Sequence, residues 1–150
     1  MATPWLTFLS FLALSQSAHL GEHVIQMIQI HVLGLRGAQA QGLVGQLNIE
    51  WVHFIWNAWV LIAAVLLLTH FRANRWLALV VFFAGWHMLE HTVIMATYVA
   101  TGVAGTPGLL GSGGALFGGL PLARPDLHFW YNLLETVPLL LAWRVQLART

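Results

Sequence analysis

The chain of 150 residues is 59% hydrophobic and only 7% charged, whereas about a quarter of the residues of a soluble domain are charged. This composition excludes an ordinary soluble domain and predicts a single integral membrane domain. The net charge of +1 comes from scattered arginines without a basic patch, so we expect no nucleic-acid partner. The absence of cysteine excludes disulfides, thiolate metal sites and iron–sulfur clusters.

Four apolar segments approach or exceed the ~20 residues that cross a bilayer as a helix. They cover residues 5–33, 49–71, 76–101 and 127–147. We therefore predict an all-α integral membrane fold, a bundle of four transmembrane helices in one domain, residues 1–150. The segment 102–125 is rich in glycine and proline but also apolar, and we expect it to fold over the mouth of the bundle.

The first and third segments share the pattern H-x-x-E-H, at residues 19–23 and again at 87–91. In a helix the spacing i, i+3, i+4, i+7 places both histidines, the glutamate and, in the first copy, Gln26 along one stripe. Ionisable side chains in a membrane interior are costly, so they are candidates for a functional site. The residues of the two copies are His19, Glu22 and His23, and His87, Glu90 and His91.

The second and fourth segments share the pattern H-F-x-[WY]-N, at residues 53–57 and 128–132. The order of the four motifs predicts a tandem duplication of a two-helix unit, with repeat one at 1–71 and repeat two at 76–150. Since each unit crosses the membrane twice, the copies would be parallel and related by a pseudo-twofold axis along the membrane normal. The polar residues of these two segments are Glu50, His53 and Asn57, and His128, Asn132 and Glu135.

The arginines predict the orientation of the bundle. Four of them flank the turn near residue 73 and the end of the chain, and only Arg36 and Arg124 lie on the opposite side. The positive-inside rule therefore predicts a multi-pass protein with both termini in the cytoplasm. At ~1.5 Å per residue, all four helices then place their polar side chains at one depth in the outer half of the bilayer.

Imidazole and carboxylate side chains at one depth predict a metal site. We predict iron, as a single or a di-iron centre, with copper, zinc and haem b as alternatives. The predicted metal ligands are His19, Glu22, His23, His53, His87, Glu90, His91 and His128. The side chains predicted to orient them are Gln26, Glu50, Asn57, Asn132 and Glu135.

Three functions are consistent with such a site. The first is redox or oxygenase chemistry on an apolar small molecule taken from the lipid bilayer. The second is a non-catalytic accessory subunit of a larger membrane complex, or of a homo-oligomer, whose polar layer joins helices or holds haem b. The third is zinc-dependent hydrolysis, because H-x-x-E-H resembles the zinc-peptidase signature in which two histidines bind zinc and the glutamate is the base.

Overall fold

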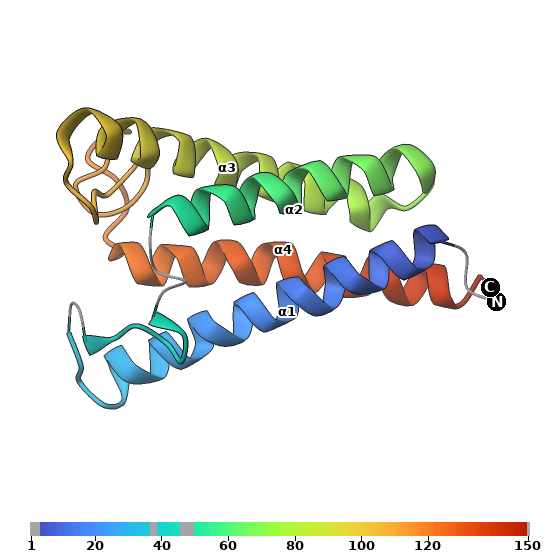
Figure 1. Cartoon of the computed structure of the whole chain (residues 1–150), viewed down its shortest axis with the longest axis horizontal. Coiled ribbons are helices and arrows are strands. Elements are labelled where there is room, and N and C mark those ends of the chain that lie inside the picture. The colour runs from blue at the N-terminus through green and yellow to red at the C-terminus, as the bar shows by residue number, and fades with distance from the viewer. Residues whose placement is uncertain (1–3, 37–38, 46–49, 150) are drawn as a thin grey trace.

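The computed structural model describes residues 4–36, 39–45 and 50–149, and these form four α-helices and no strand. The helices are α1 (Pro4–His31), α2 (Glu50–His70), α3 (Arg75–Thr101) and α4 (Arg124–Leu147). Both ends of the described chain and the turn between α2 and α3 lie at one end of the bundle (Figure 1). The described parts of the connections after α1 and α3 lie at the opposite end of the bundle (Figure 1). The predicted all-α fold of four helices is confirmed.

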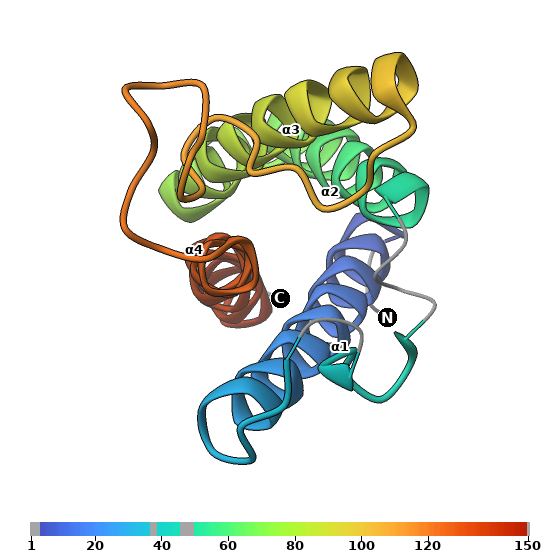
Figure 2. The ribbon, with the colours of Figure 1, turned by 90° about the vertical axis from the view of Figure 1, so that its left-hand side faces the viewer.

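The helices do not pack evenly around the bundle. α1 packs mainly on α4, α2 packs on α3, and α3 also packs on α4, whereas α1 and α2 share the smallest interface. Seen from the end that carries the long connections, α1 diverges from the other helices (Figure 2).

Local sequence fixes both ends of α3. The side-chain oxygen of Asn74 accepts a hydrogen bond from the Trp76 amide at 3.2 Å, as an N-cap does. The Asn74 amide also donates to the Ala142 carbonyl at 3.0 Å, which ties this turn to α4. Gly102 then ends the helix in the left-handed conformation, and its amide donates to the Tyr98 carbonyl.

The interior of the bundle has two layers. An apolar layer lies toward the chain termini, and its fully buried members include Leu9, Leu12, Val60, Leu67, Leu77, Val80 and Leu139. A polar layer lies toward the long connections and contains buried glutamine, histidine, asparagine and glutamate side chains. Large apolar side chains face outward, among them Phe11, Leu14, Ile55, Ile62, Phe82, Leu89 and Trp130. A polar interior beneath an apolar exterior is the arrangement expected of a membrane bundle.

Among the described residues, α2 and α3 are long and apolar enough to cross a membrane. This criterion rests on length and composition alone. Although α1 has 28 residues and α4 has 24, their sequences carry more polar residues. Several of these, such as Gln16 and Glu135, are fully buried inside the bundle. The helix count is thus established for the described chain, while two of the four helices meet the membrane criterion.

Candidate metal centre

The bundle contains two groups of three histidines whose ring nitrogens lie close enough to bind one metal ion each. Within each group, the candidate ligand atoms lie within 4.8 Å of one another, and every member is buried. We call them triad one and triad two. Triad one joins α1 to α2 and consists of His19, His23 and His53. Triad two joins α3 to α4 and consists of His87, His91 and His128.

The Nε2 atom of His91 lies close to those of both other members of triad two. It is 3.2 Å from His87 Nε2 and 2.9 Å from His128 Nε2. Nitrogen ligands bind zinc at about 2.0–2.1 Å, and tetrahedral geometry then separates neighbouring nitrogens by roughly 3.3 Å. Both separations from His91 are close to this value, and all three ligand atoms of triad two lie within 4.8 Å of one another.

The outer nitrogens of triad two are held by hydrogen bonds. His87 Nδ1 lies 2.8 Å from Glu135 Oε1, and His128 Nδ1 lies 2.9 Å from the Arg124 carbonyl oxygen. A carbonyl or carboxylate oxygen accepts, so the Nδ1 atoms carry the protons, and in a neutral ring Nε2 then has a free lone pair. Metal-binding histidines are oriented in this way in known sites.

Triad one presents nitrogens that have no hydrogen-bond partner. His19 Nε2, His23 Nε2 and His53 Nδ1 are all buried and unpaired in the described chain. The other nitrogen of His23, Nδ1, lies 3.3 Å from the side-chain oxygen of Gln26. Buried polar atoms nearly always have a partner, and three orphaned nitrogens grouped together point to a ligand. A metal ion would satisfy all three.

The two triads lie against each other. The rings of His53 and His91 are stacked, with centroids 5.6 Å apart and planes within 5° of parallel. The rings of His23 and His128 lie 6.2 Å apart. The six imidazoles therefore form one continuous cluster contributed by all four helices.

The glutamates of the two H-x-x-E-H motifs bind backbone amides of the connections. Glu22 accepts the amides of Leu43 at 2.6 Å and Val44 at 2.9 Å. Glu90 accepts the amides of Leu109 at 2.8 Å and Leu110 at 3.2 Å. Each motif glutamate thus holds the connection that follows its own helix. Among the described residues, the groups of closely spaced ligand atoms contain histidine alone, without either glutamate.

A glycine in each connection makes this contact with the glutamate possible. Gly42 and Gly108 have φ angles of +75° and +69°, in the left-handed region that glycine favours. A Cβ atom on Gly42 would collide with Glu22 Oε2, and one on Gly108 with Glu90 Oε1. The connections therefore approach the carboxylates as closely as a backbone without a side chain allows.

The remaining three acidic side chains also have protein partners. Glu50 forms a two-pronged ion pair with Arg124, at 2.6 and 2.5 Å, and accepts the Gly105 amide. Glu135 contacts His87, and Asp126 lies 2.6 Å from His31 Nε2 at the surface. All five acidic residues of the chain are accounted for. The donors that face each possible ion are therefore imidazole nitrogens.

The predicted orienting residues take matched positions in the two halves of the chain. Asn57 donates to the His53 carbonyl at 2.8 Å, and Asn132 donates to the His128 carbonyl at 2.9 Å. Each asparagine binds the turn of helix that carries its histidine. Gln26 donates to the Ala40 carbonyl at 2.9 Å, which ties the first connection to α1.

Sequence reasoning missed one central residue, Gln16. This fully buried side chain donates to Asn132 Oδ1 at 2.9 Å and to Glu135 Oε2 at 3.1 Å. Its oxygen accepts the Trp56 indole N–H at 2.9 Å. A signal existed, because Gln16 precedes His19 by three residues and so extends the polar stripe of α1 by one turn.

An aromatic ring covers the first histidine of each motif. Trp56 stacks on His19, with centroids 5.0 Å apart, and Tyr131 lies 4.8 Å from His87. These two aromatic residues occupy the same position of the H-F-x-[WY]-N pattern. The Trp86 indole donates to the Tyr131 hydroxyl at 3.1 Å, which fixes that ring in place.

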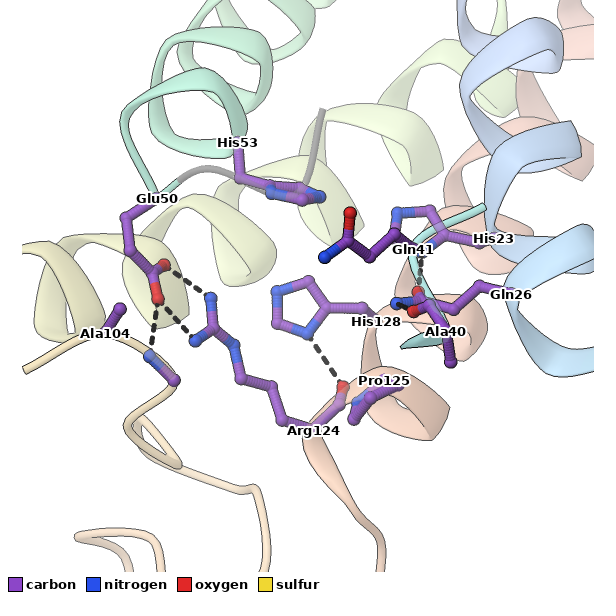
Figure 3. A pocket seen from close by; sticks show the side chains of 11 residues that line it. His23, Gln26, Ala40, Gln41, Glu50, His53, Ala104, Arg124, Pro125 and His128 are labelled. Atoms are coloured by element: carbon purple, nitrogen blue, oxygen red, sulfur yellow. Dashed lines mark hydrogen bonds and ion pairs between the residues drawn. The ribbon is translucent and has the colours of Figure 1, made fainter. Parts of the chain in front are cut away.

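A pocket of about 630 Å³ reaches the histidine cluster from the end that carries the long connections (Figure 3). Its lining includes His23 and His53 of triad one and His128 of triad two. The ion pair of Glu50 with Arg124 forms one wall, and residues of both connections also line the pocket. The pocket is within the usual range of small-molecule sites, 300–1,000 Å³. A small molecule in it would contact both triads.

Two histidines lie outside the cluster. His31 is exposed at the end of α1. His70, the last residue of α2, stacks on Trp5 with centroids 4.6 Å apart.

No protein-family model, curated protein sequence or solved structure matches the chain.

Proposed function

We propose that this protein is an integral membrane metalloprotein that binds a pair of transition-metal ions, one in each histidine triad. The observation that carries the proposal is the close approach of His91 Nε2 to the Nε2 atoms of His128 and His87 in triad two, at 2.9 and 3.2 Å. The three orphaned nitrogens of triad one support a second ion. The matched contacts of Asn57 and Asn132, and of Glu22 and Glu90, support the proposed duplication.

The ligand atoms that face each triad favour a different metal from the iron that the sequence predicts. Iron was expected because Glu22 and Glu90 were counted as ligands, and non-haem iron favours two histidines with a carboxylate. With both glutamates bound to loop amides, the donors are imidazoles, which suit copper and zinc. We propose copper, since it binds nitrogen ligands most tightly among the divalent first-row metals.

The contacts argue against two alternatives from the sequence. A haem needs open space between two axial histidines, but in each triad a third imidazole lies within 4.8 Å of the other two. A zinc peptidase needs the motif glutamate as a general base at the metal. Glu22 and Glu90 instead accept hydrogen bonds from backbone amides.

We propose that all four helices cross the membrane, α1 and α4 as well as α2 and α3. Two observations support this: the buried position of the polar residues of α1 and α4, and the apolar side chains on their outer faces. The arginine distribution supports the further proposal that both termini are in the cytoplasm and that the pocket faces the outer side.

The reaction class that we propose is oxidation of a small apolar molecule bound in the pocket. The support is the position of the pocket, which exposes one or two histidines of each triad to its contents. A two-electron donor bound there could reduce both ions from Cu(II) to Cu(I) and release its protons to solvent, and an external oxidant such as dioxygen would have to reoxidise them. Copper supplies the change of oxidation state that zinc cannot.

The test is metal analysis of the detergent-purified protein. We expect two equivalents of copper in the natural protein and one equivalent each in His19→Ala/His23→Ala and His87→Ala/His91→Ala. The control, His31→Ala/His70→Ala, removes the two histidines outside the cluster and should retain both ions. A folded natural protein without metal would overturn the proposal and favour a structural subunit of a larger complex. Two equivalents of zinc would keep the metal pair and overturn the oxidation chemistry.

A further inference from the structure

The two triads differ in the residues that lie behind them, and the difference can be read from the sequence. The two H-x-x-E-H motifs match each other, at residues 19–23 and 87–91, and so do the two H-F-x-[WY]-N motifs, at residues 53–57 and 128–132. Gln16 and Glu135 lie just outside these motifs, and neither has a counterpart in the other half of the chain. Glu135 stands three residues after Asn132, and the corresponding residue after Asn57 is Val60. Gln16 stands three residues before His19, and the corresponding residue before His87 is Ala84.

Glu135 lies directly behind triad two. One of its oxygens is 2.8 Å from His87 Nδ1, and the other accepts the side-chain amide of Gln16 at 3.1 Å. Glu135, Gln16 and His87 are all fully buried. The carboxylate thus lies in the low-dielectric interior, between the Gln16 amide and the His87 imidazole. Its negative charge favours a metal cation bound to the opposite nitrogen of that imidazole.

Triad one has no such carboxylate. His19, the counterpart of His87, is covered by the Trp56 ring, and the four other acidic side chains all have partners elsewhere. Val60 and Ala84, the counterparts of Glu135 and Gln16, are buried apolar residues. Glu50 lies one turn of helix from His53, but its charge is paired with that of Arg124. A divalent ion in triad one would therefore be held by imidazoles that, among the described residues, have no carboxylate hydrogen-bonded to them.

We propose that the two sites have unequal affinities and fill in order, with triad two first, because Glu135 acts as a positioning residue for His87. This rests on the proposed function, since it assumes that both triads bind metal. A carboxylate behind a ligand histidine fixes its tautomer, makes the ring a stronger donor and offsets part of the ion's charge. Removing such a partner lowers metal affinity by about 10- to 100-fold.

The experiment is a titration of the metal-stripped, full-length protein with Zn²⁺ in detergent, in competition with a chromophoric chelator. Zinc suits the same imidazole donors and has no redox chemistry to complicate the binding curve. We expect two dissociation constants that differ by about 10- to 100-fold. His19→Ala/His23→Ala should keep the tight site, and His87→Ala/His91→Ala should keep the weak one.

Glu135→Gln is the decisive variant, because it preserves the shape of the side chain and removes its charge. It should weaken the tight site by about 10- to 100-fold and leave the weak site unchanged. Asp126→Asn, which removes a carboxylate beside a histidine outside the cluster, should change neither constant. A purely structural role for Glu135 would instead alter both sites together, or neither.

The outcomes separate this inference from the proposed function. No zinc binding by the folded natural protein would overturn both. Two equal constants, or a tight site that survives in His87→Ala/His91→Ala, would overturn the inference and leave the metal pair standing. If Glu135→Gln does not fold, the two histidine variants still assign the tight site to one triad and decide the matter.

Discussion

Replacing Glu90 with alanine distinguishes the role seen in the structure from the role that its motif suggests. Glu90 is fully buried and accepts the amides of Leu109 and Leu110 at 2.8 and 3.2 Å. A hydrogen bond to a charged acceptor contributes about 1.5–3 kcal/mol. The two leucines are only half-buried, so we use the lower value for each bond. Glu90→Ala should therefore lower the free energy of unfolding by about 3 kcal/mol.

The assay follows unfolding and metal content on the same preparations. Helix content is monitored by circular dichroism while SDS is added to mixed micelles, and metal is measured by mass spectrometry. Glu90→Ala should lose stability and retain two equivalents of metal. Glu90→Gln keeps an oxygen that can accept both amides but loses the charge, so it should lose about half as much stability. Leu89→Ala, on the outward face of α3, should change neither quantity. Loss of one metal equivalent at unchanged stability would refute the reasoning and make Glu90 a ligand.

Three further predictions use the same unfolding and metal measurements. Gly42→Ala should destabilise the protein by about 1–3 kcal/mol, because the residue has a φ of +75° and its Cβ would meet Glu22, whereas Gly21→Ala, with open space around it, should not destabilise. Leu139→Ala should cost about 2–5 kcal/mol by opening a cavity in the apolar layer, with both metal ions retained. Arg124→Gln should cost about 3 kcal/mol, because Glu50 is left buried with its charge unpaired. Glu50→Gln/Arg124→Gln should recover part of that loss, and an additive double-mutant cycle would contradict the ion pair.

The helices and the histidine cluster could be predicted because both depend on periodicity. Long apolar segments need a helix to satisfy their backbone in a membrane, and each predicted segment matches a helix of the structure. Histidines four residues apart lie within about 40° on a helix, so His19 and His23, like His87 and His91, had to share a face. The matching motifs on the partner helices supplied His53 and His128.

The direction of the glutamates could not be predicted from the motif alone. Glu22 lies about 60° to one side of His19 and about 100° from His23, so it sits on the flank of the histidine stripe. Whether a flanking side chain turns to the metal or to a neighbouring loop depends on where that loop runs. Here glycines in the left-handed region bring the two connections against the carboxylates, and such tertiary contacts leave no periodic signal.

The ion pair of Arg124 and Glu50 was missed for a similar reason. Arg124 was read as a topology signal, because a lone arginine at the end of a span carries no other pattern. In the structure it lies at the start of α4 and binds the first residue of α2, 74 positions away. A contact between residues so far apart becomes visible only when the helices are placed side by side.

The most direct test of the metal pair is X-ray absorption spectroscopy of the metal-loaded protein. We expect a shell of nitrogen neighbours at about 2.0 Å, with the outer-shell scattering of about three imidazole rings for each metal ion. His87→Ala/His91→Ala should halve the metal signal and leave the same imidazole pattern on the ion that remains. A shell dominated by oxygen, a sulfur shell or the scattering pattern of a porphyrin would contradict the three-histidine sites.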